Sequence, residues 1–378
     1  MAWNIRKRKL SGDRIRILVV DDSVVIRRLV TQALEPDPAL EVAGVAANGV
    51  IALSKIAQLR PDVVTLDIEM PEMDGLEALR RIRREYPDTR VVMFSTLTER
   101  GAAVTLEALA LGADDYVAKV SNEGSLDRSL ARLRGELIPK VKQFFDFPPT
   151  QAPVAQIAAP ARPRMEGSRS ASQLVAIGVS TGGPTALAEI MPRFPANFPL
   201  PVLIVQHMPP LFTRLLSERL DHACALAVRE AVEGEALAPG VALIAPGDFH
   251  LKLQTRGARV HVRLDQSPAE NSCRPSVDAL FRSAAEVYGG AVTAVILTGM
   301  GQDGLRGAEL LRAKGAHIIA QDEATSVVWG MPGAVVEAGI ADTILPLGAV
   351  PGEICRRAGL PPGTFGAGVP PMETSCLR

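Results

Sequence analysis

Three residues that could activate one another each follow a separate apolar, strand-like run of this 378-residue chain. They are Ser180 after residues 174–179, His207 after residues 202–206, and Asp303 after residues 294–302. Residues just past the carboxyl ends of parallel strands share one edge of a sheet, so we expect the three side chains to meet. A serine, a histidine and an aspartate together are what nucleophilic attack by a serine hydroxyl requires.

Ser180 lies in the segment Gly178-Val179-Ser180-Thr181-Gly182, which fits the G-x-S-x-G pattern of a sharp turn between a strand and a helix. The glycines permit the turn, and N–H groups at the start of the helix can stabilise an oxyanion. The same residues are also typical of a tight turn or an anion-binding loop, so the motif alone leaves both interpretations open. The chain order of serine, histidine and aspartate differs from that of an ordinary α/β-hydrolase, in which the acid precedes the histidine.

The identity of the base and of the acid each has an alternative. Among the five histidines, only His250 competes with His207, which lies between a strand-like run and Met-Pro-Pro. A single histidine is more often structural than catalytic, so both remain candidates. Asp303 is also a candidate N-cap for a helix that begins at Leu305.

A second set of polar residues follows strand-like runs nearer the start of the chain. The set consists of Asp21, Asp22, Asp67, Ser95 and Lys119. Three carboxylates at one edge of a sheet repel each other and favour a divalent cation such as Mg²⁺. A lysine and a hydroxyl beside them would hold the oxygens of a phosphoryl group. One acid alone is typical of a helix cap or a solvated loop, but the joint pattern predicts a phosphoryl site.

The composition predicts two soluble α/β domains. Hydrophobic residues make up 47% of the chain and aromatic residues 4%, which favours the aliphatic core of parallel sheets. The net charge of −1 gives no reason to expect a nucleic-acid partner. No apolar run approaches the length of a membrane span, and no signal-peptide pattern opens the chain. The cysteines at 224, 273, 355 and 376 show no metal-ligand spacing and read as free thiols, so we expect a cytoplasmic protein that is not inserted in a membrane.

Changes in composition predict the domain boundaries. A Pro-, Ala- and Ser-rich stretch around residues 146–172 cannot bury enough apolar surface to fold and reads as a linker. We expect a basic tail at 1–13, a first domain at 14–134, a helix end and linker at 135–172, a second domain at 173–350 and a flexible tail at 351–378.

The first domain resembles a response-regulator receiver domain. The segment Met70-Pro71-Glu72-Met73-Asp74-Gly75 matches the loop that follows the acceptor in that family. The family usually has Lys-Pro where this chain has Lys119-Val120. By position, the resemblance implies a phosphoacceptor, metal-binding acids, a switch hydroxyl, a switch aromatic and a phosphate-contacting lysine. Asp67 matches the phosphoacceptor, and Asp21, Asp22 and Asp67 together match the metal-binding acids. Ser95 matches the switch hydroxyl, Tyr116 the switch aromatic and Lys119 the phosphate-contacting lysine.

The second domain resembles the catalytic domain of the chemotaxis protein-glutamate methylesterases. The matching segments include GVSTGGP at 178–184, QHMP at 206–209, APGDFH at 245–250, RPSVD at 274–278 and TGMGQDG at 298–304. The resemblance implies hydrolysis of glutamate methyl esters on chemoreceptors, with release of methanol, and often deamidation of receptor glutamines. It assigns Ser180 as nucleophile, His207 as base and Asp303 as the orienting acid. It places Met300 and Thr181 at the oxyanion site, where the backbone N–H of Met300 would donate.

Together the two resemblances imply two doubly wound parallel-sheet domains, a flavodoxin-like receiver and a Rossmann-like esterase. They imply Mg²⁺ in the receiver and no cofactor for the esterase, with methylated chemoreceptor cytoplasmic domains as substrate and a chemotaxis-type histidine kinase as phosphodonor. In the family, the unphosphorylated receiver covers the esterase cleft and phosphorylation uncovers it. Two alternatives remain: a receiver-controlled esterase or amidase with another substrate, and a non-enzymatic response regulator with a binding output domain.

Overall fold

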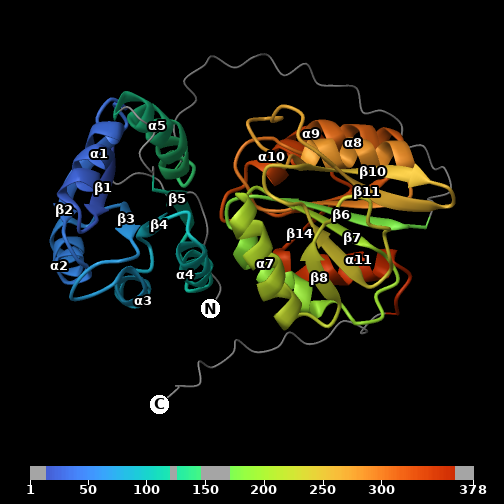
Figure 1. Cartoon of the computed structure of the whole chain (residues 1–378), viewed down its shortest axis with the longest axis horizontal. Coiled ribbons are helices and arrows are strands. Elements are labelled where there is room, and N and C mark those ends of the chain that lie inside the picture. The colour runs from blue at the N-terminus through green and yellow to red at the C-terminus, as the bar shows by residue number, and fades with distance from the viewer. Residues whose placement is uncertain (1–13, 120–125, 146–170, 362–378) are drawn as a thin grey trace. The chain divides into compact units, whose positions relative to one another are not determined.

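The computed structural model describes residues 14–119, 126–145 and 171–361. These residues form two compact units, and the boundary between the units falls in the linker (Figure 1). The expected basic tail at 1–13, Val120 of the Lys119-Val120 pair, residues 146–170 of the linker and residues 362–378 lie outside the described residues.

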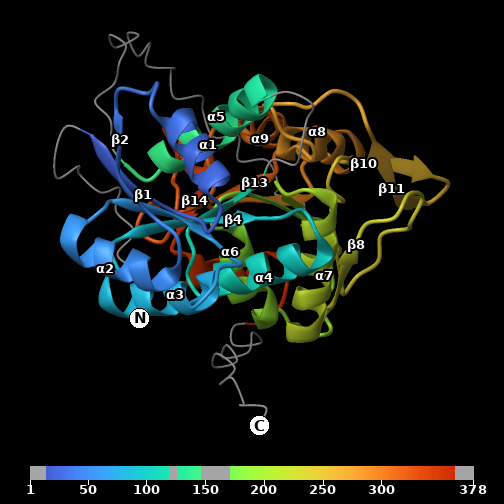
Figure 2. The same cartoon turned by 60° about the vertical axis from the view of Figure 1, so that its left-hand side comes forward.

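The N-terminal unit is built on a parallel sheet with the strand order β2-β1-β3-β4-β5. Five helices connect and follow these strands. The elements are β1 (Ile15–Val20), α1 (Val24–Leu34), β2 (Leu40–Ala46), α2 (Gly49–Leu59), β3 (Val63–Asp67), α3 (Gly75–Glu85), β4 (Arg90–Ser95), α4 (Glu99–Ala110), β5 (Asp115–Ala118) and α5 (Leu126–Lys142). Helices α1 and α5 pack together on one face of the sheet, and α2, α3 and α4 lie across the other (Figure 2).

Capping residues start four of these helices immediately after the loops at the carboxyl edge of the sheet. Ser23, Asn48, Asp74 and Thr98 each accept a hydrogen bond from a backbone N–H of the first helical turn. Side-chain acceptors at this position satisfy donors that the helix itself leaves unpaired. The carboxyl ends of β1 and β3 are thereby held next to helix starts, where the connections turn to opposite sides of the sheet and ligands bind in open α/β folds.

The C-terminal unit has a seven-stranded parallel sheet with the order β14-β13-β12-β6-β7-β9-β8. Its strands are β6 (Leu174–Val179), β7 (Val202–Gln206), β8 (Ala227–Glu230), β9 (Val241–Ile244), β12 (Val292–Ile296), β13 (His317–Gln321) and β14 (Thr343–Leu345). Its helices are α6 (Gly183–Ile190), α7 (Pro210–Ala223), α8 (Val277–Tyr288), α9 (Leu305–Ala313), α10 (Met331–Glu337) and α11 (Val350–Arg357), with short 3₁₀ turns at Met191–Arg193 and Leu347–Ala349. Helices α8, α9 and α10 lie on one side of the sheet, and α7 and α11 on the other (Figure 1).

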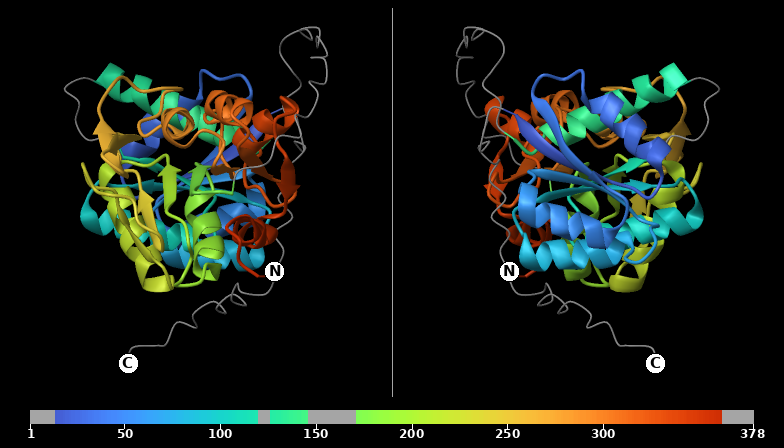
Figure 3. Two further views of the ribbon diagram at one scale, coloured as in Figure 1. Left: turned by 90° about the vertical axis from the view of Figure 1, so that its right-hand side faces the viewer. Right: turned by 90° about the vertical axis from the view of Figure 1, so that its left-hand side faces the viewer.

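The two parallel sheets confirm the expected fold class, and an antiparallel hairpin adds to it. The hairpin joins β10 (His250–Arg256) to β11 (Arg259–Asp265) and was not predicted from the sequence. It forms a separate two-stranded ribbon at one end of the unit (Figure 3, left). Leu251 and Val262 of the hairpin are fully buried and join a core that also contains Leu280 and Phe281 of α8. The hairpin therefore anchors the segment that leads to residues 270–276.

Central strands of the C-terminal sheet bring the three predicted chemical residues to one edge. Strand β6 pairs with β7 on one side and with β12 on the other. Val179 is the register partner of Gln206, so the residues that follow them are neighbours at the same edge. The chain order reverses between β6 and β12, which is the position where such folds bind ligands.

Two expected boundaries need correction. Helix α5 runs through Lys142, and Leu137, Val141 and Phe144 are buried, so the N-terminal unit extends well beyond residue 134. The expected flexible tail at 351–378 is wrong for its first residues, which form α11. Proline there occupies the first turn, where its missing N–H costs no hydrogen bond, and Ile354 and Cys355 are buried. Sequence reasoning treated proline as a sign of disorder when it marks a helix start.

In the part of the chain that the structure describes, no helix combines the length and the apolar character that crossing a bilayer demands.

Candidate active site

The turn after β6 places Ser180 at the carboxyl edge of the sheet in a tightly fixed backbone. The N–H of Ser180 donates to the carbonyl of Thr298 at 3.0 Å, and its own carbonyl accepts from the N–H of Gly183 at 2.8 Å. Gly182 has φ of +78°, a left-handed conformation that glycine adopts without strain. The side chain of Gln206 also donates to the carbonyl of Ser180 at 3.0 Å. Because these bonds hold the backbone, only the hydroxyl of Ser180 is left to move.

Close packing leaves no room for a larger residue opposite this turn. A Cβ atom at Gly299 would collide with the Cβ of Ser180 and with the Met331 sulfur. Gly299 must therefore remain a glycine, because it lies too close to Ser180 for any side chain to fit. From the sequence, the segment around Gly299 was expected to carry Asp303 and, by resemblance, the oxyanion-site residue Met300, but its close packing against Ser180 was not predicted.

His207 follows β7 and is joined to Asp303 by a hydrogen bond. Its Nε2 lies 2.8 Å from Oδ2 of Asp303, and only 11% of the histidine side chain is exposed. Its Nδ1 lies 3.5 Å from the sulfur of Cys273. Among the described residues, no hydrogen bond joins the hydroxyl of Ser180 to His207. The structure thus brings base and acid into contact, and the Nδ1 side of the ring faces Cys273.

Burial and hydrogen bonding have opposite effects on the pKa values of this pair. Burial by itself lowers the pKa of His207, but hydrogen bonds to Asp303 and Cys273 outweigh it and raise that pKa to about 10. Burial raises the pKa of Asp303, but the bonds from His207, the N–H of Val277 and the hydroxyl of Ser276 bring it down to about 2. Asp303 is therefore ionised across the physiological range.

Asp303 is held mainly by the start of α8, and the N–H of Gly304, just before α9, also donates to it at 3.1 Å. Its carboxylate accepts from the N–H of Val277 at 2.7 Å and of Asp278 at 3.2 Å, and from the hydroxyl of Ser276 at 2.8 Å. The N-cap of α9 is Gly304 instead. The positive end of a helix stabilises a carboxylate. The alternative interpretation of Asp303 as a cap for the following helix is thus replaced by one in which it faces α8.

Both ring nitrogens of His250, the rival base, are already engaged. This histidine is fully buried, its Nδ1 accepts from the N–H of Ser276 at 3.2 Å, and its Nε2 lies 3.2 Å from the carbonyl of Pro268. With no free nitrogen to receive a proton, His250 has the geometry of a residue that holds the start of α8.

A tight turn at Glu270–Cys273, which sequence analysis did not single out, contacts both His207 and Asp303. Cys273 faces His207, and the amide of Asn271 donates to Asp303 at 2.9 Å and to Asp278 at 2.9 Å. The backbone N–H and carbonyl of Glu270 and Cys273 pair with each other. The available sequence signal was the dipeptide Asn-Ser, since asparagine favours left-handed turn positions.

The two residues expected at the oxyanion site lie in the loops beside the serine. Met300 is 41% exposed, and among the described residues its N–H has no hydrogen-bond partner. Thr181 is buried, and its carbonyl accepts from the hydroxyl of Thr298 at 2.9 Å. The Met300 N–H is therefore available to a ligand, while the Thr298 bond fixes the backbone at Thr181.

In the N-terminal unit, Asp21, Asp22 and Asp67 come together at the edge of the sheet. One oxygen from each lies within 4.8 Å of the others. Lys119 lies 2.7 Å from Oδ1 of Asp67 and 2.9 Å from Oδ2 of Asp21. Burial raises the pKa of Asp67, and the negative charge of nearby Asp21 raises it further. Lys119 lowers this pKa, but the raising effects are larger and the pKa is about 6. The pKa of Lys119 is raised, since its bonds to the two acids outweigh the effect of burial.

The residues present fit a hard divalent cation. Oδ2 of Asp67 is buried without a hydrogen-bond partner among the described residues, although buried polar atoms are normally satisfied. Three carboxylates around an unsatisfied oxygen form the donor set that Mg²⁺ prefers. Asp21 and Asp67 are buried and Asp22 is exposed, so the site is open on one side.

The hydroxyl and the aromatic residue expected to act as switches are packed inside this unit. The hydroxyl of Ser95 accepts from Thr105 at 2.6 Å and lies 3.2 Å from the carbonyl of Gly101 on α4. Tyr116 is 7% exposed, and the ammonium of Lys140 lies 4.8 Å from its ring centre. Burial, with Asp115 and Glu136 nearby, raises the pKa of Tyr116, so the ring stays neutral. In this arrangement Ser95 is bound by residues of α4, and Tyr116 packs against Lys140 of α5.

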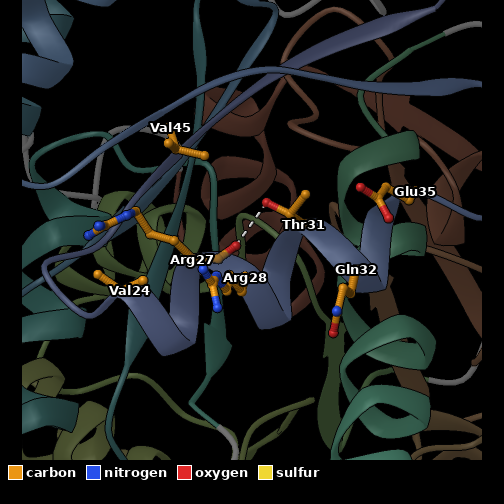
Figure 4. A pocket seen from close by; sticks show the side chains of 7 residues that line it. All are labelled: Val24, Arg27, Arg28, Thr31, Gln32, Glu35 and Val45. Atoms are coloured by element: carbon orange, nitrogen blue, oxygen red, sulfur yellow. Dashed lines mark hydrogen bonds between the residues drawn. The ribbon is translucent and has the colours of Figure 1, made fainter.

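A surface groove along α1 borders the acid cluster, because the guanidinium of Arg27 in its lining donates to the backbone carbonyls of Asp21 and Asp22 at 2.6 and 3.0 Å (Figure 4). It is lined by Val24, Arg27, Arg28, Thr31, Gln32, Glu35 and Val45. Thr31 donates to the carbonyl of Arg27 at 2.8 Å within it, and Val24 is 54% exposed. None of the predicted site residues lines this groove.

A receiver-like unit followed by an α/β unit with a serine, histidine and aspartate cluster defines a response regulator with an enzymatic output domain. Residues 17–131 match the family model of the response regulator receiver domain, and residues 175–354 match that of the CheB methylesterase. The chain belongs to the CheB methylesterase family.

Similar proteins cover nearly the whole chain. A protein-glutamate methylesterase/protein-glutamine glutaminase of Trichodesmium erythraeum is 48% identical over 92% of this chain and 99% of its own. A protein of the same name from Nocardioides is 53% identical over 91% of this chain and 95% of its own. One from Thermotoga maritima is 44% identical, over 89% and 96% respectively. The similarity to these relatives thus spans both domains.

Proposed function

We propose that this chain hydrolyses γ-glutamyl methyl esters of chemoreceptors and deamidates receptor glutamines, with Ser180 as nucleophile and phosphorylation of Asp67 as the control. Family membership over nearly the whole chain supports the reaction. The observation that carries the residue assignment is the hydrogen bond of 2.8 Å between His207 and Asp303 beside the turn that presents Ser180. The chemoreceptor cytoplasmic domains are the protein substrate and a histidine kinase supplies the phosphoryl group.

The nucleophilic step uses the nitrogen of His207 that Asp303 leaves free. The hydroxyl of Ser180 turns toward Nδ1, passes its proton there and attacks the ester carbonyl. Asp303 holds the ring through Nε2 and stabilises the positive charge that forms. The N–H of Met300 donates to the oxyanion.

Collapse of the tetrahedral intermediate releases methanol, which takes its proton from His207 and leaves a γ-glutamyl ester on Ser180. Water, activated by the same histidine, then cleaves this ester and regenerates the serine. With a glutamine side chain the leaving group is ammonia, and the remaining steps are the same.

In the receiver, a carboxylate oxygen of Asp67 attacks the phosphorus of the kinase's phosphohistidine. The new P–O bond forms as the P–N bond breaks, and the imidazole of the kinase leaves. Asp21, Asp22 and Asp67 would hold Mg²⁺, which neutralises negative charge between the acids and the incoming phosphoryl group. Lys119 contacts Asp67 now and would pair with a phosphoryl oxygen after transfer. Phosphorylation adds roughly −1.5 to −2 charges at this edge, which gives Ser95 a new acceptor to turn toward.

The test of the nucleophile is methanol release from methylated receptor fragments. Ser180→Ala should lower turnover by about 10⁶-fold, since removing one triad member in a serine hydrolase has this effect. The circular dichroism spectrum should stay unchanged. Near-normal methanol release by a folded Ser180→Ala protein would refute the assignment.

The test of the control is the same assay with a small phosphodonor and Mg²⁺. The wild-type rate should rise only when both are present, and the rate of Asp67→Asn should not respond. If Asp67→Asn incorporates phosphate to the wild-type extent, another residue is the acceptor.

A further inference from the structure

The side of His207 that the reaction needs is occupied by a thiol. Asp303 takes Nε2, so Ser180 has only Nδ1 to which it can pass a proton. In the structure the sulfur of Cys273 lies 3.5 Å from this Nδ1. Serine and thiol therefore compete for one nitrogen.

The position of Cys273 is built into the fold. The backbones of Glu270 and Cys273 exchange hydrogen bonds of 3.1 and 2.8 Å, and Asn271 and Ser272 between them have φ of 51° and 64°. Two consecutive left-handed residues between a paired donor and acceptor form a tight, fully determined turn. The carboxylate of Glu270 is bound by the Arg282 guanidinium on α8 at 2.6 Å. The amide of Asn271 holds the turn to Asp303 at 2.9 Å.

Two titratable groups face the ring of His207. Asp303 faces it from the loop after β12 and Cys273 from the turn, whereas Asp278 on α8 lies behind Asp303 and shares Asn271 with it. Burial lowers the pKa of His207, while the hydrogen bonds and charges of both facing groups raise it. A protonated ring cannot accept the proton of Ser180. Each group that stabilises the protonated ring therefore reduces the fraction of His207 that can act as a base.

We propose that Cys273 is a positioning residue of the esterase: its thiol occupies the Nδ1 side of His207 and must be displaced before Ser180 can pass on its proton. The proposal rests on the proposed function and deepens it. Cys273 holds the base in a paired, inactive arrangement that a bound substrate and Ser180 must open. It also makes the ring harder to deprotonate.

The experiment is the pH dependence of methanol release by the full-length protein, measured as kcat/KM on a methylated receptor fragment. The variants are Cys273→Ala and Cys273→Ser, with Cys224→Ala as a matched control, because Cys224 follows α7 and does not contact His207. In Cys273→Ala, the midpoint of the acid limb should move down by about 0.5 to 1 pH unit, the size expected for one ordinary hydrogen bond. Below the wild-type midpoint this is roughly a threefold to tenfold gain.

Cys273→Ser should move the midpoint in the same direction but by less, because a serine hydroxyl lacks the coulombic effect of Cys273 on the ring yet can still accept a hydrogen bond from the protonated ring. It also keeps the size of the side chain, so it remains informative if the alanine variant does not fold. Cys224→Ala should titrate like the wild type.

A second measurement reads the ring directly. In full-length Ser180→Ala protein labelled with ¹⁵N-histidine, the His207 signal should lose its proton at lower pH when Cys273 is also replaced. An unchanged midpoint in both measurements, or a loss of activity equal at every pH, would show that Cys273 only fills space. Methanol release that survives in Ser180→Ala would instead refute the proposed function, so the two failures are distinguishable.

Discussion

Two buried aspartates at the edges of the two sheets have opposite environments. Asp67 ends β3 and is 3% exposed, and Asp303 follows β12 and is 2% exposed. One oxygen of Asp67 is bound by Lys119 and by the N–H of Ile68, and the other has no partner among the described residues. Both oxygens of Asp303 accept hydrogen bonds.

The difference shows that the supply of hydrogen-bond donors, and not burial, separates the two roles. Burial raises the pKa of both acids, yet that of Asp67 stands at about 6 and that of Asp303 at about 2. A carboxylate that many donors hold is rigid and stays charged, which suits a residue that orients a base. A carboxylate with an unsatisfied oxygen can take a cation and form a new bond.

The largest effect that would test this comparison concerns the base. His207→Gln should reduce turnover by about 10⁶-fold, as removal of the histidine does in other serine triads. His250→Gln is the matched control, because both of its ring nitrogens are engaged with Ser276 and Pro268. Its specific activity per folded molecule should stay within about tenfold of the wild type, since no proton passes through it. The reverse order of the two variants in a methanol-release assay would assign the base to His250.

The next largest effect concerns the acid. Asp303→Asn should lower kcat by about 10⁴-fold, because an amide stabilises the wrong tautomer of the histidine and no longer balances its charge. Asp278→Asn is the control: Asp278 is also buried and shares the donor Asn271, but it does not contact His207. Its kcat should fall far less. Equal losses in the two variants, measured by methanol release, would mean that the pair acts as a structural network.

The sequence was sufficient to predict the residues that follow central strands. Ser180, His207 and Asp303 are separated by up to 123 positions, but neighbouring parallel strands bring them to one edge, and strand periodicity is a local signal. The same holds for Asp21 and Asp67 after the central strands β1 and β3, and the strand signal also placed Lys119 after the edge strand β5.

Contacts that depend on tertiary packing were not predictable in this way. Asn271 reaches Asp303, 32 residues away, only because the β10–β11 hairpin and α8 set the path of the turn between them. Two of the N–H groups that hold Asp303 come from α8, while its position in the sequence pointed only to α9, whose N-cap Gly304 supplies one more. Local patterns identify a strand end, but they do not state which helix start faces it.

The smallest effect, on stability, distinguishes the two aspartates by its sign. The folded-state pKa of Asp67 is above the usual value of 3.8, so the folded receiver loses stability as pH rises from about 4 through about 6. Asp67→Asn should therefore stabilise the receiver at pH 8, by up to about 3 kcal/mol, and change little near pH 4. The folded-state pKa of Asp303 is about 2, so its contribution is present above pH 4 and is lost as pH falls toward 2. Asp303→Asn should accordingly destabilise the esterase domain at pH 8.

Urea unfolding of the full chain at pH 8 and pH 5, without Mg²⁺, measures the change in the free energy of unfolding that each substitution causes. The unfolding transition of each domain is followed separately. The control is Asp22→Asn, an exposed acid in the same cluster as Asp67, which should stay within about 0.5 kcal/mol of the wild type. Adding Mg²⁺ should stabilise the wild-type receiver more than the Asp67→Asn receiver, because the cation neutralises the charge that the variant lacks. If Asp67→Asn lowers the stability of the receiver at pH 8, its carboxylate is satisfied in the folded state after all. The contrast between the two acids would then lie in their position and not in their supply of donors.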